Sequence, residues 1–213
     1  MMSIADNIQA IRARMDAAAV RAGRDPRGIL LVGASKMNDT AACREAIAAG
    51  IDALGENRVQ EMTAKLAEGA YEGAPLHFIG HLQRNKVRQV VGQVALIHSV
   101  GSLELLEVNI GGEESKSGFA PQALYAAAEK ARSYSALRVR GLMTIPPVER
   151  EPHGNLPYFE KVSRFYVDIS RDLYDNGFEY LSMGMSDDFE DAIAAGATMV
   201  RVGSAIFGHR QYQ

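Results

Sequence analysis

Lys36 directly follows an apolar run, residues 29–35 (ILLVGAS), that is rich in large aliphatic side chains. Such a run is typical of a strand buried on both faces of a parallel sheet. In parallel α/β sheets and barrels, ligands bind at the carboxyl ends of the strands, so the Lys36 amine is placed to point into a binding site. A primary amine in that position can form a Schiff base with an aldehyde. The alternative is a solvated lysine at a strand end, which is the commoner environment for this residue type.

Two turns that combine glycine with serine follow the last two predicted strands. Ser186 lies three residues after the predicted strand 180–183, and Gly203 and Ser204 follow the predicted strand 198–202. In a (β/α)8 barrel, phosphate is usually held by the loops after strands seven and eight, through backbone N–H groups and a helix N-terminus. Either turn alone could be an ordinary entry into a helix. Together they predict a phosphate site formed by both serines and the glycine.

Arg201 lies inside the last predicted strand, two residues before Gly203, so both should face the same side of the barrel. A permanently charged guanidinium there could hydrogen-bond a ring nitrogen or an anion. The alternative is a buried ion pair with a carboxylate such as Glu56 or Asp187. An aldehyde-reactive lysine and a phosphate site on opposite sides of one barrel mouth together predict pyridoxal 5′-phosphate (PLP) as the cofactor.

Strands and helices that alternate along the chain must position these residues. Behind Ser3, the spacing of the apolar residues predicts an opening helix that ends before Gly23. Eight strands are predicted, at residues 29–35, 51–57, 76–80, 94–98, 108–110, 137–143, 180–183 and 198–202. Further helices are predicted at residues 40–49, 59–68, 85–91, 121–131, 157–176 and 189–195. The pattern predicts an α/β fold with one PLP-binding domain, residues 1–213: a single (β/α)8 TIM barrel with an extra N-terminal helix.

One connection is too short for this fold. Only residues 101–107 separate the fourth predicted strand, which ends near Val100, from the fifth. A crossover between parallel strands needs about a dozen residues or more. Two explanations are open: the biological chain has further residues at this point, or the unit is truncated. We favour further residues, because the other units have their full length.

Composition limits the possible functions. The 213 residues carry a net charge of −3, which gives no electrostatic reason to expect nucleic acid or an anionic membrane as a partner. Charged residues interrupt the first 23 residues, so neither a signal peptide nor a transmembrane segment is predicted there. The single cysteine, Cys43, excludes an internal disulfide and suits a buried thiol in a reducing compartment. We therefore expect a cytoplasmic protein.

Motifs of several other enzyme classes are missing from the sequence. The five histidines show no metal-ligand spacing, so we predict no metal site. The chain has neither a Gly-x-Ser-x-Gly elbow nor a Walker phosphate loop. Hydrolase-triad and nucleotide-motor functions are therefore disfavoured.

Six segments of the chain resemble the YggS/PROSC family of pyridoxal phosphate homeostasis proteins. These segments are LLVGASK (30–36), LGENRVQE (54–61), HFIGHLQRNK (77–86), VNIGGEESKSG (108–118), RGLMTIPP (140–147) and LSMGMSDDFEDAIAAGATMVRVGSAIFG (181–208). That family is similar to the barrel domain of bacterial alanine racemase. The resemblance extends over almost the whole chain, and the chain departs from it at the short segment 101–107.

The resemblance implies a role in the cofactor site for seven residues. Lys36 forms the Schiff base, and Arg201 contacts the pyridine nitrogen. The phosphate is held by Ser186, Gly203 and Ser204, and the ring pocket is lined by Asn57 and Met143. Because an arginine cannot accept a proton, it leaves the ring nitrogen neutral and the cofactor a weak electron sink. Catalysis through a carbanion is therefore disfavoured.

The function implied by the resemblance is PLP homeostasis: reversible binding at Lys36, buffering of the free aldehyde, and delivery to PLP-dependent apo-enzymes through transient contacts. The main alternative is a PLP-dependent amino-acid racemase. In alanine racemase the second acid–base group is a tyrosine from a separate β-domain, whereas this chain ends at Gln213, directly after the barrel. Tyr158 or Tyr212 would have to replace that tyrosine. We therefore expect a monomer without robust catalytic activity.

Two further hypotheses concern lysine chemistry. A phosphosugar aldolase of the Schiff-base type would share the lysine, the barrel and the phosphate site, but its lysine usually lies on a later strand, whereas Lys36 ends the first. Lys116, in the loop after the fifth predicted strand, is a candidate second amine for transient transfer of the cofactor. Its alternative role is that of a solvated loop residue.

Overall fold

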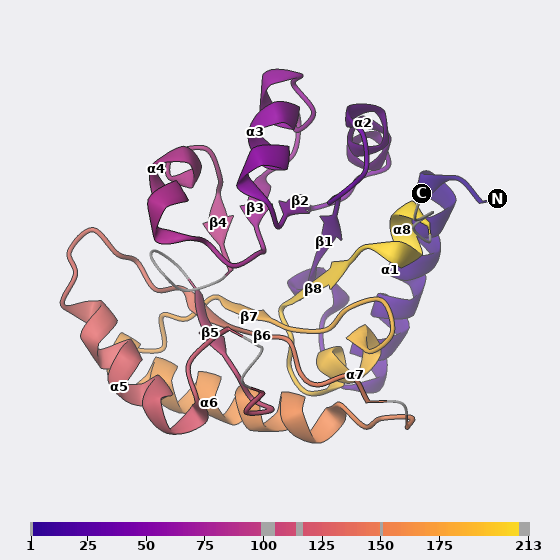
Figure 1. The fold of residues 1–213 in the computed structure, drawn as a ribbon. Coiled ribbons are helices and arrows are strands. Elements are labelled where there is room, and N and C mark those ends of the chain that lie inside the picture. Colours follow the sequence, from indigo (N-terminus) through magenta and orange to yellow (C-terminus); the bar gives the residue numbers. More distant parts are fainter. Residues whose placement is uncertain (1, 99–104, 114–116, 150, 209–213) are drawn as a thin grey trace.

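Eight parallel strands surrounded by helices make up the part of the chain that the computed structural model describes, residues 2–98, 105–113, 117–149 and 151–208. The strands are β1 (Leu30–Ala34), β2 (Ala53–Glu56), β3 (Leu76–Phe78), β4 (Leu96–Ile97), β5 (Leu105–Val108), β6 (Gly141–Thr144), β7 (Tyr180–Ser182) and β8 (Met199–Val202). The α-helices are α1 (Ile4–Arg21), α2 (Thr40–Ala48), α3 (Val59–Ala67), α4 (Val87–Val90), α5 (Pro121–Arg132), α6 (Leu156–Tyr174), α7 (Phe189–Ala194) and α8 (Ser204–Phe207), and two short 3-10 helices are η1 (Pro26–Gly28) and η2 (Arg84–Lys86). Helices α2, α3 and α4 cover one half of the sheet, and α5 and α6 cover the other (Figure 1).

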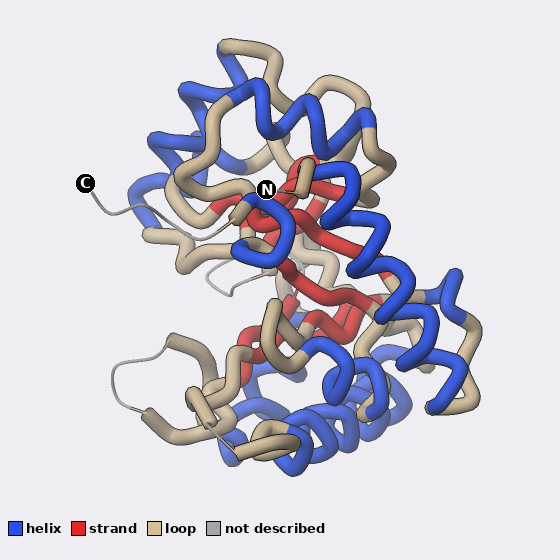
Figure 2. The backbone as a smooth tube through the Cα atoms, turned by 90° about the vertical axis from the view of Figure 1, so that its right-hand side faces the viewer, coloured by secondary structure: helices blue, strands red, loops and turns tan. Residues whose placement is uncertain are grey.

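The strands pair in the order β4-β3-β2-β1-β8-β7-β6-β5, so the first and last strands of the chain are neighbours inside the sheet. In the β1–β8 pair, Val32 lies beside Arg201 and Gly33 beside Val202. This curled parallel sheet, seen from the side in Figure 2, confirms the predicted TIM-barrel-like α/β fold.

Strands β4 and β5 are the two edges of this sheet, and no pairing between them occurs among the described residues. Seven residues, 98–104, connect them, which is fewer than a parallel crossover needs. The short connection predicted at residues 101–107 falls mostly outside the described residues, which resume at Leu105. The described strands therefore form an open barrel rather than a closed one.

Helix α1 is the predicted extra N-terminal helix. Ser3 and Asp6 form a reciprocal capping box, in which the Ser3 hydroxyl accepts the Asp6 N–H and the Asp6 carboxylate accepts the Ser3 N–H. Its apolar face, which includes Ile8, Ile11 and Met15, is buried against the barrel. Because α1 contacts α7 and α8, it braces the end of the chain that carries β8.

Side chains fill the barrel interior below the strand ends. Val32, Ala53, Leu96, Met143 and Met199 form a buried cluster inside the curled sheet, separate from the larger core between the sheet and the helices. The interior is thus a packed core, as expected for a barrel of eight strands. It gives the ligand-facing ends of the strands a rigid base.

Two predicted strands differ most from the structure in where they start. The fifth was predicted at residues 108–110 but is Leu105–Val108, and the sixth was predicted at residues 137–143 but begins at Gly141. Residues 137–140 are half-buried or exposed, and Arg138 and Arg140 pair with Glu179. At Gly141 the backbone passes so close to Tyr180 that a Cβ would lie 1.8 Å from its carbonyl oxygen.

Within the described ranges, the helices are too short or too polar to cross a lipid bilayer. Cys43 is completely buried, as predicted, and burial raises the pKa of its thiol.

Candidate functional site

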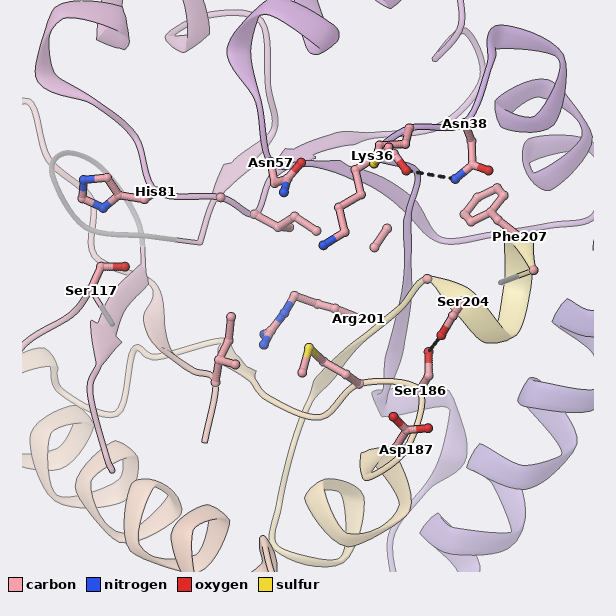
Figure 3. Close-up of a pocket in the computed structure, with 18 of the residues that line it drawn as sticks. Lys36, Asn38, Asn57, His81, Ser117, Ser186, Asp187, Arg201, Ser204 and Phe207 are labelled. Atoms are coloured by element: carbon pink, nitrogen blue, oxygen red, sulfur yellow. Dashed lines mark hydrogen bonds between the residues drawn. The ribbon is translucent and has the colours of Figure 1, made fainter. Parts of the chain in front are cut away.

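A cavity of about 750 Å³ opens at the carboxyl ends of the strands. This volume lies in the range of small-molecule and cofactor sites. Six of the seven predicted site residues line it: Lys36, Asn57, Ser186, Arg201, Gly203 and Ser204. They come from the ends of β1, β2, β7 and β8, which are far apart in sequence (Figure 3). The barrel topology therefore brings them together.

The Lys36 side chain reaches into this cavity toward Arg201 (Figure 3). Lys36 lies two residues after β1, at a sharp turn in which Met37 adopts a left-handed backbone with φ 63°. The Lys36 carbonyl accepts a hydrogen bond of 3.1 Å from the Asn38 side chain, and the Ser35 N–H donates to the Gly55 carbonyl of β2 at 3.0 Å. These two hydrogen bonds fix the backbone of the turn before and after Lys36.

A buried group of polar side chains supports Lys36 from behind. The Glu56 carboxylate, which is 0% exposed, accepts hydrogen bonds from the Ser35 hydroxyl at 2.7 Å, the Lys65 ammonium at 2.7 Å and the Tyr71 hydroxyl at 3.0 Å. Lys65 also donates to the Ser35 carbonyl at 2.9 Å. Burial opposes the charged form of Lys65, but its bonds to Glu56 and Glu61 outweigh this and raise its pKa. Sequence reasoning missed this cluster.

Arg201 is buried beneath the cavity, with 4% of its surface exposed. Its guanidinium donates to the Ser182 hydroxyl of β7 and, at 3.0 Å, to the Thr144 carbonyl of β6. Burial lowers the Arg201 pKa to about 10, an effect that Asp188 and Glu107 partly offset, so the side chain stays cationic at neutral pH.

The alternative role of Arg201, an ion pair with Glu56 or Asp187, is not found among the described residues. Glu56 pairs with Lys65 instead, at 2.7 Å. Asp187 is exposed at the rim of the cavity. The positive charge of the Arg201 guanidinium, which lines the cavity, is therefore not neutralised by an ion pair with either carboxylate.

The two predicted phosphate loops meet on one side of the cavity. The Ser204 hydroxyl donates to the Ser186 hydroxyl at 3.1 Å, and the Ala205 N–H points at the same oxygen at 3.5 Å. Gly203 packs closely on the end of β1, where an added Cβ would lie 3.4 Å from Ala34. Hydroxyl groups from both loops and a backbone N–H of the second loop thus lie close together on one side of the cavity.

The opposite wall contains further residues to which the sequence analysis gave no role in cofactor binding. His81 and Ser117 lie across the cavity from the two serines (Figure 3), and Glu107 and Ile145 also line it. Burial raises the Glu107 pKa, although a 3.2 Å hydrogen bond from Ser117 partly opposes this. Glu107 was missed because it directly precedes the fifth predicted strand, in a segment assigned to a short connection.

Not every predicted residue lies at the cavity. Met143 belongs to the barrel-interior cluster and is not among the described residues that line the cavity, so its role in the ring pocket stays a prediction. Tyr158 packs against the hydrophobic core. Lys116 and Tyr212 lie outside the described residues. The described ranges contain no group of three or more potential metal-ligating side chains.

Two buried histidines lie below the cavity and predict an acid-sensitive fold. Burial lowers the pKa of His77 to about 4 and that of His98 well below its usual value. The unfolded chain therefore binds more protons than the native protein once the pH falls below about 6.5, and stability decreases on acidification through that window. For His77 alone, the free energy of unfolding falls by about 3 kcal/mol between about pH 6.5 and about pH 4.

Denaturant unfolding at a series of pH values would measure this effect. The matched variant is His77→Asn, whose side-chain oxygen can replace the His77 Nδ1 as an acceptor but does not titrate. We expect the variant to lose less stability than the wild type between about pH 6.5 and about pH 4. Equal losses would show that His77 already titrates normally in the folded protein.

Known proteins and a family model match this chain over all or almost all of its length. A family model described as "Alanine racemase, N-terminal domain" matches residues 2–211. The pyridoxal phosphate homeostasis protein of Pseudomonas aeruginosa is 41% identical over 230 residues, which cover 100% of this chain and 98% of that protein. The protein of the same name from Escherichia coli K12 is 39% identical over 233 residues, which cover 100% of this chain and 99% of that protein.

A solved structure is also similar. The structure of PipY from Synechococcus elongatus with PLP bound has a TM-score of 0.81 and 30% identity, and the match covers 97% of this chain and 100% of that chain. The alignment with the Pseudomonas aeruginosa relative is longer than the 213 residues of this chain, so that relative has residues that this chain lacks. That the additional residues belong to the connection between β4 and β5 stays a prediction.

Proposed function

Because the chain belongs to the family of pyridoxal phosphate homeostasis proteins, which share the alanine racemase N-terminal domain, we propose that it holds PLP as a Schiff base on Lys36. Its role would be intracellular vitamin B6 homeostasis, by buffering the cofactor or delivering it to apo-enzymes. The observation that carries this proposal is that an amine, a buried guanidinium and two serine hydroxyls line one cavity. The PLP-bound structure of PipY, a similar protein, supports it.

The described residues fit this cofactor. Bound PLP supplies an aldehyde that reacts reversibly with primary amines and a pyridine ring that withdraws electrons. Lys36 would provide the amine, while Ser186, Ser204 and the backbone at Gly203 would provide donors for the phosphate. The side-chain oxygen of Asn57, which also lines the cavity, is buried without a hydrogen-bond partner among the described residues. Such an unsatisfied atom is costly unless a ligand or water pairs with it.

Arg201 makes the site suited to holding the cofactor rather than to carbanion chemistry. A guanidinium with a pKa of about 10 remains a hydrogen-bond donor at neutral pH and does not release its proton to a pyridine nitrogen. The carbonyl of Thr144 and the hydroxyl of Ser182 hold it in place from β6 and β7. The side chain would therefore orient the ring without making it a strong electron sink.

Replacing Arg201 with glutamate tests this assignment. A carboxylate beside the ring would make the pyridine nitrogen more basic, so we expect a shifted absorbance spectrum of the bound cofactor. Arg201→Gln serves as the control, because it removes the charge and keeps a donor. Circular dichroism would establish that both variants are folded. An unchanged spectrum in folded Arg201→Glu would show that the arginine is not beside the ring.

The proposal itself is tested by the intact mass of the purified protein before and after borohydride reduction. We expect reduction to fix one cofactor covalently, and peptide mapping to place it on Lys36. The same map covers Lys116, which we propose is not labelled. A label confined to another lysine, or no label after incubation with PLP, would contradict the proposal.

Amino-acid racemisation is the alternative function, and it requires a second acid–base group. None of the described residues that line the cavity is a tyrosine, and their other titratable groups include His81 and Glu107. Incubation of the PLP-loaded protein with L-alanine or D-alanine separates the two functions. We expect little interconversion, whereas efficient racemisation would favour the enzyme. We further propose that the protein is a monomer that meets apo-enzymes transiently, which sedimentation would test.

A further inference from the structure

A chain of buried side chains leads from Arg201 across the barrel interior. Arg201 donates to the Ser182 hydroxyl, which lies 2.9 Å from His98 Nδ1, and His98 Nε2 lies 3.1 Å from His77 Nδ1. These four side chains are 4%, 0%, 0% and 6% exposed, in that order. They belong to β8, to β7, to the residue directly after β4, and to β3. The Arg201 guanidinium thus has a hydrogen-bonded connection to the far half of the sheet.

The arginine determines the direction of the hydrogen bonds in this chain. A guanidinium can only donate, so Ser182 Oγ accepts from it and its hydroxyl hydrogen is available to His98 Nδ1. His98 then carries its proton on Nε2 and donates it to His77 Nδ1. If His98 Nδ1 instead donated to Ser182 Oγ, the buried Ser182 hydroxyl hydrogen would have no acceptor among the described residues. An unsatisfied buried donor is unfavourable. Both imidazoles are therefore neutral, with the proton on Nε2.

These hydrogen-bonded side chains connect the two halves of the sheet. β4 and β5 are the edges of the open barrel, so among the described residues the backbone pairing that joins the two halves of the sheet is that of β1 with β8. The bond from Ser182 to His98 connects residues 84 apart and crosses between those halves. Because Arg201 holds Ser182, the site and the cross-barrel contact are parts of one hydrogen-bonded unit.

We propose that His98 is a positioning residue that acts through Ser182 to hold the Arg201 guanidinium in place below the cavity. The N–H groups not used by Ser182 and Thr144 then remain available to a ligand in the cavity. The effect on cofactor binding rests on the proposed function, whereas the proton pattern of the two histidines does not.

Nitrogen-15 NMR of the histidine rings in the protein without added PLP tests the proton pattern. We expect both His77 and His98 to show a protonated Nε2 and an unprotonated Nδ1 at neutral pH. A protonated Nδ1 on His98, or a charged ring on either residue, would overturn the proposed direction. This measurement decides the hydrogen-bond chain even if the protein does not bind PLP.

A pair of variants tests the positioning role. His98→Phe keeps the shape of the ring and removes the acceptor, whereas the oxygen of His98→Asn can replace Nδ1 and accept from Ser182. We expect His98→Phe to weaken PLP binding about tenfold and to shift the cofactor spectrum, and His98→Asn to restore both. His153→Phe, at an exposed histidine, is the control.

Thermal unfolding of each variant separates positioning from packing. If His98→Phe lowers only the unfolding temperature, or if the asparagine variant is as impaired as the phenylalanine variant, the positioning role is wrong. Should His98→Phe not fold, Ser182→Ala removes the same link with a smaller change, and an unaltered spectrum in that variant would overturn the proposal.

Discussion

We expect the variant Lys36→Ala to keep its fold and to show no covalent attachment of PLP. Lys36 is half-buried, and its side chain projects into the cavity rather than into the core, so its removal creates no hydrophobic void. Without the amine, no covalent bond to an aldehyde can form at this position. We expect the visible absorbance of the bound cofactor to disappear and borohydride reduction to add no mass.

Two further variants make this result specific. Lys36→Arg keeps a positive charge in the cavity but does not form a Schiff base, so it separates electrostatic attraction from covalent attachment. Lys161→Ala, at an exposed lysine on α6, is the matched control and is expected to label normally. Covalent labelling that persisted in Lys36→Ala would mean that another amine carries the cofactor.

Lys65→Met will destabilise the fold strongly. The substitution leaves the Glu56 carboxylate buried without its cation. One oxygen of this carboxylate already lacks a hydrogen-bond partner among the described residues. Breaking one side of a buried ion pair typically costs about 3–5 kcal/mol, because the remaining charge is uncompensated. Denaturant unfolding at neutral pH would measure the loss.

The control for this prediction is Arg171→Met, which breaks exposed ion pairs on α6 and should leave the stability almost unchanged. The double variant Lys65→Met/Glu56→Leu removes both charges and should recover much of the lost stability. We also expect Lys65→Met to loosen Lys36, because the ammonium holds the Ser35 carbonyl. A wild-type stability for Lys65→Met would contradict this prediction.

The sequence predicted those features that depend on local spacing. An apolar run followed by Lys36 predicted a buried strand with an amine at its end, and β1 ends two residues before it. The spacing of Arg201 and Gly203 within one strand predicted that both face the same side, and both line the cavity. Because the ends of parallel strands meet at one face of a barrel, residue positions within single strands were enough to collect most of the site.

The partners of these residues could be decided only by the tertiary structure. Arg201 was assigned a ring nitrogen or a carboxylate, but its protein contacts are Ser182 and the carbonyl of Thr144, on strands that precede it by tens of residues. The bond between His98 and Ser182 depends on the curvature of the sheet, which brings β4 opposite β7. No local pattern encodes that curvature.

The sequence by itself thus determined which side chains lie at the ends of the strands, because side-chain direction along a strand follows a period of two residues. The tertiary structure decided which of them share hydrogen bonds. Glu56 and Lys65 illustrate the difference: each looks like an ordinary polar residue in the sequence, yet packing buries them together behind Lys36. The cost of an unpaired buried charge then makes that contact obligatory.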